Sequence, residues 1–287
     1  MDDLYVDKLI EDSDGGIQES FDTELLRSFD MAKEKVSEDL VDYSRVKIHK
    51  DKLRLSGDGI FYTLQGEGSS MGYPVMFLRL HICNLRCVWC DAYYTWDPRS
   101  KEFWTESFEK SIEETANELT EEWNSNCKNK DTRKRLVITG GEPLIQKRQI
   151  DYLMQELDGW HIEIETNGTI MPTANQIMNC RFNCSPKLEN SDNSKSARIK
   201  PDVIKVLADS DTQFKFVAMN ENDLNEIVRD YIKPFKISPE KILIMPQGVT
   251  TEEVNENAKR LVEDVKRHGF RMMTRLHVDL WGARRRV

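Results

Sequence analysis

Three cysteines lie within a stretch of eight residues, Cys83-Asn-Leu-Arg-Cys87-Val-Trp-Cys90, directly after an apolar run. Three thiolates can bind three irons of a four-iron cluster and leave the fourth iron without a protein ligand. An iron that is open in this way can bind a small molecule and pass an electron to it. The spacing of the cysteines therefore predicts an iron–sulfur cluster that does chemistry on a bound ligand.

A zinc site is the alternative for the same thiols. Zinc usually takes four nitrogen or sulfur ligands, often in two pairs, so it would also need Cys180 or Cys184. The remaining cysteine, Cys127, stands alone. Clustered cysteines in a reducing compartment indicate metal binding before disulfides, and the C-x3-C-x2-C spacing is unusual for zinc. The spacing favours the cluster.

A second motif, Thr139-Gly140-Gly141-Glu142-Pro143, ends a run of β-forming residues. Two glycines let the backbone approach a ligand without interference from a Cβ atom. Because this run lies at a strand tip downstream of the cysteines, we expect it to hold the amino group of S-adenosylmethionine beside the cluster. Taken alone, the run is equally typical of a strand-to-helix turn, with Pro143 near the start of the helix.

The elements that position these motifs alternate as short apolar runs and longer amphipathic ones, which is the pattern of βα units in a parallel sheet. Strands are predicted at residues 75–82, 136–139, 161–165, 213–218 and 242–245. Helices are predicted at residues 107–123, 149–157, 223–232 and 251–268, the first capped by Thr105 and Glu106, and residues 189–200 are predicted to form a mobile loop. The residues that follow strands would meet at the carboxyl edge of the sheet, where such folds carry chemistry: Cys83, Gly140, Thr166, Ser185 and Gln247.

Residues 1–46 are predicted to form an acidic extension, separate from a main domain at residues 47–287. Between Thr23 and Val46, apolar residues recur at helical spacing, which predicts one amphipathic helix. The helix is expected to pack on the main domain, and the alternative is a partner-binding segment.

Composition and charge restrict the class of protein. Hydrophobic residues make up 39% of the chain and charged residues 32%, and no apolar run approaches the length that spans a bilayer. A net charge of −9 argues against a nucleic-acid partner, because neutralising phosphates needs a surplus of basic residues. The acidic start lacks the features of a secretory signal. We therefore expect a cytoplasmic protein that acts on a small molecule, without a membrane.

The cysteine motif followed by Gly-Gly-Glu-Pro resembles the radical S-adenosylmethionine superfamily. From about residue 60 onward, further stretches resemble the 7-carboxy-7-deazaguanine synthase family within it. These stretches are Thr63-Leu-Gln-Gly-Glu-Gly68, Phe77-Leu-Arg-Leu80, Cys90-Asp-Ala-Tyr-Tyr-Thr-Trp96, Glu165-Thr-Asn-Gly168, Ser185-Pro-Lys187, Met245-Pro-Gln-Gly248 and Leu276-His-Val-Asp-Leu-Trp-Gly282.

The resemblance implies a fold, a reaction and partners. The fold would be an incomplete βα barrel of the TIM type, here with an N-terminal helical extension. The reaction would contract the ring of 6-carboxy-5,6,7,8-tetrahydropterin to 7-carboxy-7-deazaguanine with loss of ammonia, on the route to queuosine and other 7-deazapurines. A [4Fe–4S] cluster and S-adenosylmethionine would be the cofactors, a flavodoxin-like or ferredoxin-like protein would supply the electron, and the enzyme would be a homodimer.

The resemblance also implies roles for single residues. Cys83, Cys87 and Cys90 would hold the cluster and, with Glu67 and Arg79, act directly in the reaction. Arg79 would pair with the substrate carboxylate, although a structural ion pair is the alternative. His277 would donate to substrate or pack against Trp281. The substrate contacts would be Leu64, Gln65, Gly66, Glu67, Arg79, Thr139, His277 and the terminal Val287.

The residues that the resemblance assigns to S-adenosylmethionine lie beside the cluster or after later strands. They are Trp89, Cys90, Asp91, Gly141, Glu165, Asn167, Ser185, Pro186, Lys187, Gln247, Gly248, Val249 and Thr250. Hydroxyl, ammonium and amide groups of this kind can bind a ribose, a carboxylate and an adenine edge.

Ala92 departs from the family pattern, because family members place a Thr or Ser there whose hydroxyl ligates magnesium. A methyl group cannot coordinate this hard cation, so the need for magnesium is in doubt. Two other readings stay open: an activase that installs a glycyl radical on a partner protein, and a regulatory protein that binds the cluster without turnover.

Overall fold

The computed structural model describes residues 46–282, 284 and 285. The helix predicted over residues 23–46 lies outside the described residues except for Val46, and Val287 also lies outside them. Val46 is buried against Ile82 and Phe103 of the main domain.

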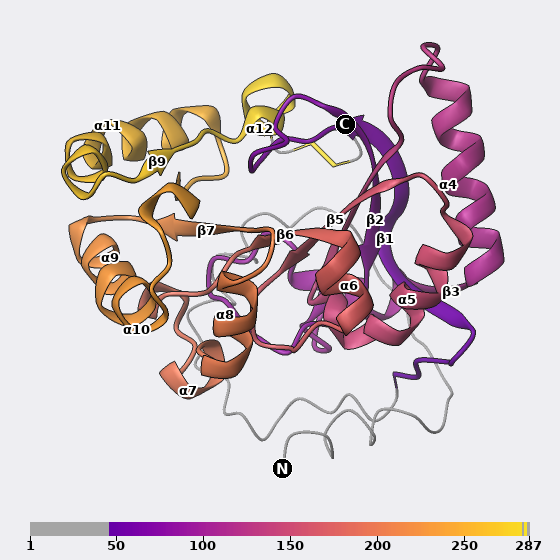
Figure 1. The fold of residues 1–287 in the computed structure, drawn as a ribbon, viewed down its shortest axis with the longest axis horizontal. Helices are drawn as coiled ribbons and strands as arrows, with labels where there is room; N and C mark the ends of the chain where they lie inside the picture. Colours follow the sequence, from indigo (N-terminus) through magenta and orange to yellow (C-terminus); the bar gives the residue numbers. More distant parts are fainter. Residues whose placement is uncertain (1–45, 283, 286–287) are drawn as a thin grey trace.

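The strands between residues 46 and 282 form one nine-stranded sheet in the order β3-β1-β2-β4-β5-β6-β7-β8-β9 (Figure 1). β1 pairs antiparallel with β2 and with β3, and every later pair is parallel. The strands are β1 (Lys52–Leu64), β2 (Pro74–Leu80), β3 (Ser107–Ser111), β4 (Arg135–Gly140), β5 (His161–Thr166), β6 (Cys180–Cys184), β7 (Thr212–Ala218), β8 (Ile242–Pro246) and β9 (Arg271–Met272). Because β3 and β9 are the two margins, the barrel is incomplete, as predicted.

Helices surround the sheet in Figure 1. The α-helices of the described chain are α3 (Lys101–Thr105), α4 (Ile112–Asn126), α5 (Lys147–Glu156), α6 (Ala174–Asn179), α7 (Lys195–Arg198), α8 (Pro201–Ala208), α9 (Glu221–Glu226), α10 (Lys233–Phe235), α11 (Thr251–His268) and α12 (Leu276–Trp281). A π-helical stretch, Ile227–Ile232, continues α9. No helix in the described part of the chain is long and apolar enough to cross a membrane.

The parallel strands alternate apolar and polar side chains, which gives the sheet two unlike faces. The apolar side chains pack in the main core, where each contributes about 1.5–3 kcal/mol by burial; among them are Leu78, Ile138, Ile164, Phe182 and Phe214. The intervening positions of the same strands carry Arg79, Thr139, Glu165, Asn183 and Lys215. Since residues one apart on a strand point to opposite faces, these polar groups share the inner face of the barrel.

The predicted helix 107–123 begins too early. Residues Ser107–Ser111 form β3, which pairs with the first half of β1, and the helix starts at Ile112. Its cap is Ser111, in a capping box with Glu114, and not Thr105 or Glu106. Pairing with β1 thus overrides the helical pattern that the sequence shows before residue 112.

Three further strands and one loop also differ from expectation. β1, β6 and β9 were not predicted, because Gly57 and Gly59 interrupt the first, polar residues alternate through the second, and the third has only two residues. The segment predicted as a mobile loop, residues 189–200, instead contains a short 3₁₀ turn (Glu189–Ser191) and α7, and it buries Ser191 and Arg198. The other predicted elements are confirmed to within about two residues at each end, including α11 over residues 251–268.

Candidate functional site

The cysteine loop follows β2 directly, and its three thiols are largely withdrawn from solvent. Cys87 is buried, and Cys83 and Cys90 are partly buried. Burial, with smaller effects from Asp91 and Cys87, raises the pKa of Cys90 to about 12. The metal-free thiols are therefore protonated at neutral pH, and iron must displace these protons when it binds.

The packing of the other cysteines argues against zinc. A cluster places each thiolate on a different iron, so its ligands need not converge on one point. Cys180 and Cys184, which zinc would need, are packed in the main hydrophobic core. The three thiols of the loop fit a cluster with an open iron.

The Gly140-Gly141 pair at the end of β4 lies against the cysteine loop. A Cβ atom on Gly140 would come within 2.0 Å of the Leu80 carbonyl oxygen, and one on Gly141 within 2.1 Å of the Ile82 carbonyl oxygen. These glycines thus admit the backbone of the cysteine loop, and the contact of Gly141 with a ligand stays a prediction. The close contact fixes the loop that carries Cys83.

Glu142 joins the tips of β4 and β5. Its buried carboxylate accepts hydrogen bonds from the Thr166 hydroxyl (2.8 Å), the Asn167 amide (2.7 Å) and the Leu144 amide (3.0 Å). Burial raises the pKa of Glu142 to about 7, although the three donors favour the ionised form. Asn167 in turn donates to Asn84 of the cysteine loop at 2.9 Å.

A strap formed by residues 188–194 crosses the cysteine loop on its other side. The Ser191 carbonyl accepts from the Val88 amide, and the Asn193 side-chain oxygen accepts from the Arg86 amide at 3.0 Å. The Trp89 indole donates to the Asn190 carbonyl at 3.0 Å. This strap is the segment in which the sequence showed only a mobile loop.

The loop between β1 and β2 enters the interior of the barrel. Gln65 lies 3.5 Å from Glu165 of β5, Ser70 donates to Glu163 of the same strand, and Glu67 pairs with Lys215 of β7. The Leu64-Gln-Gly run thus approaches the site from within the barrel. Thr139 donates to Glu165 at 2.9 Å, so residues from four elements meet on this inner face.

Arg275 connects this interior to the cysteine loop. Its guanidinium donates to Glu67 (3.0 Å), to Asp91 (2.8 Å) and to the Gly248 carbonyl (2.9 Å). Only 14% of the Arg275 side chain is exposed, so water competes little for these bonds. Asp91 follows Cys90 in the chain, and Arg79 lies close enough to interact with Asp91 electrostatically.

Glu67 has two cationic neighbours in this network. Burial favours its neutral acid, but Lys215 and Arg275 outweigh burial and hold the pKa of Glu67 well below its usual range. For Lys215, burial opposes the charge, yet the carboxylates of Glu67 and Glu165 raise the pKa of Lys215 above its ordinary value. The pair is therefore ionised across the physiological range.

His277 lies over Gly66. A Cβ atom on Gly66 would come within 2.2 Å of the His277 Nδ1 atom, so only glycine fits there. The Leu276 amide donates to the Gly66 carbonyl at 3.0 Å, which ties α12 to the loop after β1; these two segments lie side by side in Figure 1. Burial lowers the pKa of His277, so its ring is neutral at neutral pH.

The remaining predicted residues follow β6 and β8. Lys187 donates to the Ser185 hydroxyl at 2.9 Å, and its ammonium lies 5.6 Å from the ring centre of Trp89. Pro186, which separates Ser185 from Lys187 in the chain, is buried. In the run Gln247–Thr250, the Thr250 hydroxyl already caps α11, and the Val249 amide donates to Glu253 at 2.8 Å.

Comparison with known proteins identifies the family. The model described as "Radical SAM superfamily" matches residues 78–278. The 7-carboxy-7-deazaguanine synthase of Pyrobaculum aerophilum is 33% identical over 231 residues, which cover 79% of this chain and 94% of that protein. That of Halobacterium salinarum is 32% identical over 247 residues, covering 77% and 88%. The chain belongs to the 7-carboxy-7-deazaguanine synthase family.

A solved structure agrees with this assignment at the level of the fold. The crystal structure of QueE from Escherichia coli matches with a TM-score of 0.59 at 22% identity, covering 79% of this chain and 95% of that one. As a member of the radical SAM superfamily, the present chain uses a [4Fe–4S] cluster and S-adenosylmethionine.

Four residues of the site were not found from the sequence of this synthase-family chain. Lys215 and Arg275 hold Glu67, and Asn190 and Asn193 hold the cysteine loop. Arg275 directly precedes the Leu276-His277 run, and that position was the only available signal for it. The asparagines lie in a polar segment that has no periodic pattern.

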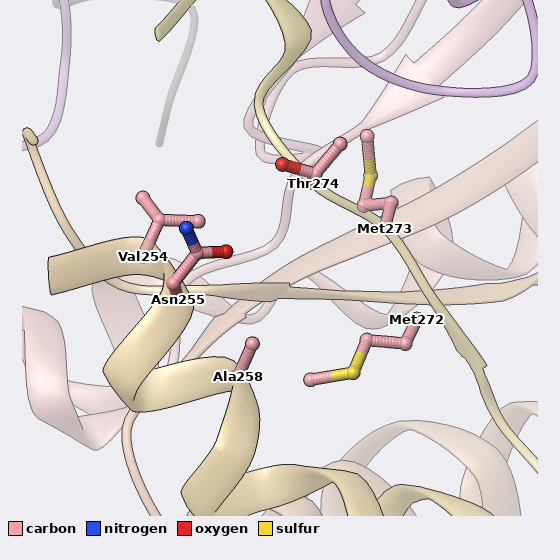
Figure 2. Close-up of a pocket in the computed structure, with 6 residues that line it drawn as sticks. All are labelled: Val254, Asn255, Ala258, Met272, Met273 and Thr274. Atoms are coloured by element: carbon pink, nitrogen blue, oxygen red, sulfur yellow. The ribbon is translucent and has the colours of Figure 1, made fainter. Parts of the chain in front are cut away.

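A pocket of about 240 Å³ lies between α11 and β9. Figure 2 shows its lining, which is mostly apolar: Val254, Asn255, Ala258, Met272, Met273 and Thr274. None of the predicted site residues lines it. Its volume is below that of ordinary small-molecule sites, about 300 Å³ or more, so we do not place the site there.

Proposed function

We propose that this chain is a 7-carboxy-7-deazaguanine synthase, a lyase that converts 6-carboxy-5,6,7,8-tetrahydropterin into 7-carboxy-7-deazaguanine and ammonia. The two products contain all the atoms of the substrate, so the reaction needs no net oxidant. When bound, the cluster and S-adenosylmethionine together supply the radical that removes a hydrogen atom from the substrate. Atom balance then requires that a hydrogen atom is returned, and S-adenosylmethionine acts as a cofactor.

One observation carries this proposal. Arg275 bonds both to Asp91, the neighbour of Cys90, and to Glu67, which the family pattern assigns to the substrate. The cysteine loop and the polar interior therefore form one continuous site. Radical chemistry needs this proximity, because the group that abstracts hydrogen must lie next to the carbon that loses it.

The interior residues are proposed to bind and orient the pterin. Arg79 would pair with the substrate carboxylate, which its planar guanidinium fits with two hydrogen bonds. The carboxylate oxygens of Glu67 and Glu165 can accept hydrogen bonds from N–H groups of the pterin ring, and the His277 ring can donate or accept one hydrogen bond. The remaining proposed contacts are Leu64, Gln65, Gly66, Thr139 and Val287.

The residues around the cysteine loop are proposed to bind S-adenosylmethionine. They are Trp89, Cys90, Asp91, Gly141, Glu165, Asn167, Ser185, Pro186, Lys187, Gln247, Gly248, Val249 and Thr250. The ammonium of Lys187 and the hydroxyl of Ser185 already point to each other, so both would exchange this bond for one to the ligand. Thr250 would contribute while it still caps α11.

The proposal extends to partners. The electron would come from a flavodoxin-like or ferredoxin-like protein, the enzyme would work as a homodimer in the cytoplasm, and residues 1–46 would form the helical extension. Magnesium is in doubt, because Ala92 offers only a methyl group. The Ala92 carbonyl already accepts from the Thr95 hydroxyl at 2.7 Å.

The test is product formation by the reconstituted protein. Under anaerobic conditions, reduced wild-type protein with S-adenosylmethionine and carboxytetrahydropterin should form 7-carboxy-7-deazaguanine, which mass spectrometry detects. Cys87→Ala should lose both the iron and the product. Cys127→Ala is the matched control, because Cys127 is buried in the main core, away from the loop, and this variant should keep both.

The outcomes separate the alternatives. Protein that carries a full cluster and cleaves S-adenosylmethionine without forming the deazaguanine would contradict the synthase assignment. Radical installed on a partner protein would indicate an activase, and a cellular effect that survives Cys87→Ala would indicate a regulatory role. Neither alternative is supported by the relatives, which are named as synthases.

A further inference from the structure

Each thiol of the cysteine loop faces at least one side-chain hydrogen-bond donor. The Asn193 amide nitrogen lies 3.4 Å from the Cys87 sulfur, and the Asn167 amide nitrogen lies 4.0 Å from the Cys83 sulfur. The Trp96 side chain faces the Cys90 thiol. These donors come from three separate segments, so the environment of the sulfurs is assembled by the tertiary fold.

The donor to Cys87 differs from the other two. Cys83 also accepts a backbone N–H from Leu85, and Cys90 accepts one from Ala92; no substitution short of proline removes these backbone donors. Cys87 instead accepts from the side chain of Asn193, whose N···S distance is the shorter of the two asparagines. Cys87 is therefore the sulfur whose hydrogen bonding depends most on a single side chain.

Asn193 is held in place by the strap. Its side-chain oxygen accepts from the Arg86 amide at 3.0 Å, and its amide nitrogen also lies 3.1 Å from the Ser191 hydroxyl. An amide group has two hydrogens, so one can serve Ser191 and the other Cys87. The preceding Asp192 adopts a left-handed conformation, φ 61°, which turns the chain back toward the cysteine loop.

The strap is itself fixed to the barrel. Asn190 donates to the Val217 carbonyl of β7 and to Asp223 of α9, both at 3.0 Å. Glu226 of α9 accepts from the Glu189 amide at 3.0 Å and pairs with buried Arg198 at 2.7 Å. The position of Asn193 is thus set by residues that do not touch the thiols.

We infer that Asn193 sets the reduction potential of the cluster by hydrogen bonding to the Cys87 thiolate, as a positioning and tuning residue of the synthase. Adding an electron to a cluster increases the negative charge on its thiolate ligands. An N–H dipole aimed at a thiolate stabilises the reduced form more than the oxidised form and so raises the potential. The buried strap holds this donor in a fixed position, where an exposed thiolate would have only exchanging water molecules as donors. The inference rests on the proposed function, because it requires the cluster on Cys83, Cys87 and Cys90.

The experiment is a redox titration of the reconstituted full-length protein, followed by electron paramagnetic resonance of the reduced cluster. Asn193→Leu removes the donor without adding charge. At a fixed solution potential, we expect its ratio of reduced to oxidised cluster to fall by up to about tenfold, and a tenfold change corresponds to about 59 mV for a one-electron couple. The Fe–S(thiolate) stretching frequencies in resonance Raman spectra should shift in the same variant.

Asn190→Leu is the matched control. It removes a strap asparagine that contacts Trp89, Val217 and Asp223 but no sulfur. Its potential should shift much less than that of Asn193→Leu, because Asn193 keeps its own hydrogen bonds to Arg86 and Ser191. If Asn193→Leu fails to retain iron, Asn193→Ala serves instead, because it also removes the N–H group without adding charge and introduces no bulk. It should also lower the potential.

Two results would overturn the inference: a wild-type potential in the residue-193 variants, or an equal shift in Asn190→Leu, which would assign the effect to displacement of the strap. Failure of the proposed function is distinguishable from both. Wild-type protein that binds no iron would reveal it before any potential is measured.

Discussion

Lys215 of β7 donates a hydrogen bond to the carboxylate of Glu67, although 148 residues separate the two in the chain. Both side chains are largely buried, with exposed fractions of 7% and 12%. Removing one member of a buried pair leaves the other charge uncompensated, which is strongly unfavourable. The loop between β1 and β2 therefore depends on this pair for its position inside the barrel.

Lys215→Met should lower kcat/KM for the pterin by about 100-fold, because displacement of a substrate-binding group by about 1 Å has effects of that size. Lys215→Arg should recover part of the loss, since it keeps the charge. Lys241→Met is the control: Lys241 donates to the carbonyls of Ala208 and Ser210, outside the site. Equal losses in Lys215→Met and Lys241→Met would argue for a general loss of stability.

Glu67→Gln should make the stability of the iron-free protein less dependent on pH. The pKa of Glu67 is lowered in the folded state, so its ionised form stabilises the fold above the unfolded pKa of about 4.3. That stabilisation is lost as the pH falls toward the folded pKa. Breaking the pair should cost about 3–5 kcal/mol at pH 7.

The measurement for Glu67→Gln is chemical denaturation of both proteins from pH 7 down to about pH 3, beginning above the unfolded pKa of about 4.3. The difference in unfolding free energy should be largest near pH 7 and shrink below about pH 4. A difference that stays constant over this range would show that Glu67 does not contribute through its charge.

Ile82→Gly should be more stable than Ile82→Ala, which reverses the usual order. Ile82 has φ 79°, a left-handed conformation that a β-branched residue rarely adopts. Both variants lose the packing of Ile82 on Val46 and Phe103, but only glycine removes the steric strain of a Cβ atom, about 1–2 kcal/mol. Thermal denaturation of both variants checks the order. At Ile164, which is buried in β5, the same two substitutions should keep the usual order.

Ala92→Thr should make activity depend more steeply on magnesium. Ala92 is 8% exposed and lies two residues after Cys90, so a threonine there would add a hydroxyl oxygen of the kind that magnesium prefers. Activity of chelator-treated protein, measured over a range of added magnesium, compares the two proteins. An equally steep dependence in wild type would show that magnesium binds without the residue-92 side chain.

The sequence predicts the parallel part of the barrel well, because its strands are short apolar runs followed by amphipathic helices. β4 and β8 were found in this way. β6 was not, because Arg181 and Asn183 occupy the inner face and make the strand look like a loop. β3 was taken for helix because only its pairing with β1 distinguishes it.

The cysteine motif predicts its own chemistry, since spacing alone brings three thiols together. The residues that hold the motif in place could not be predicted in this way. Arg275 and Lys215 are isolated basic residues in the sequence. They meet their partner Glu67 only because the barrel brings β7 and the segment after β9 to the loop between β1 and β2. Asn193 needs the strap to meet Cys87.

The sheet has two free margins, and the Leu276–Gly66 hydrogen bond and the Arg275–Glu67 ion pair join the segments that follow β9 and β1. This seam, an ion pair and a backbone hydrogen bond, lies where a closed barrel would have a ladder of strands. Separating this seam breaks no strand pair. Glu67, the carboxylate of this seam, is also one of the groups proposed to contact the pterin.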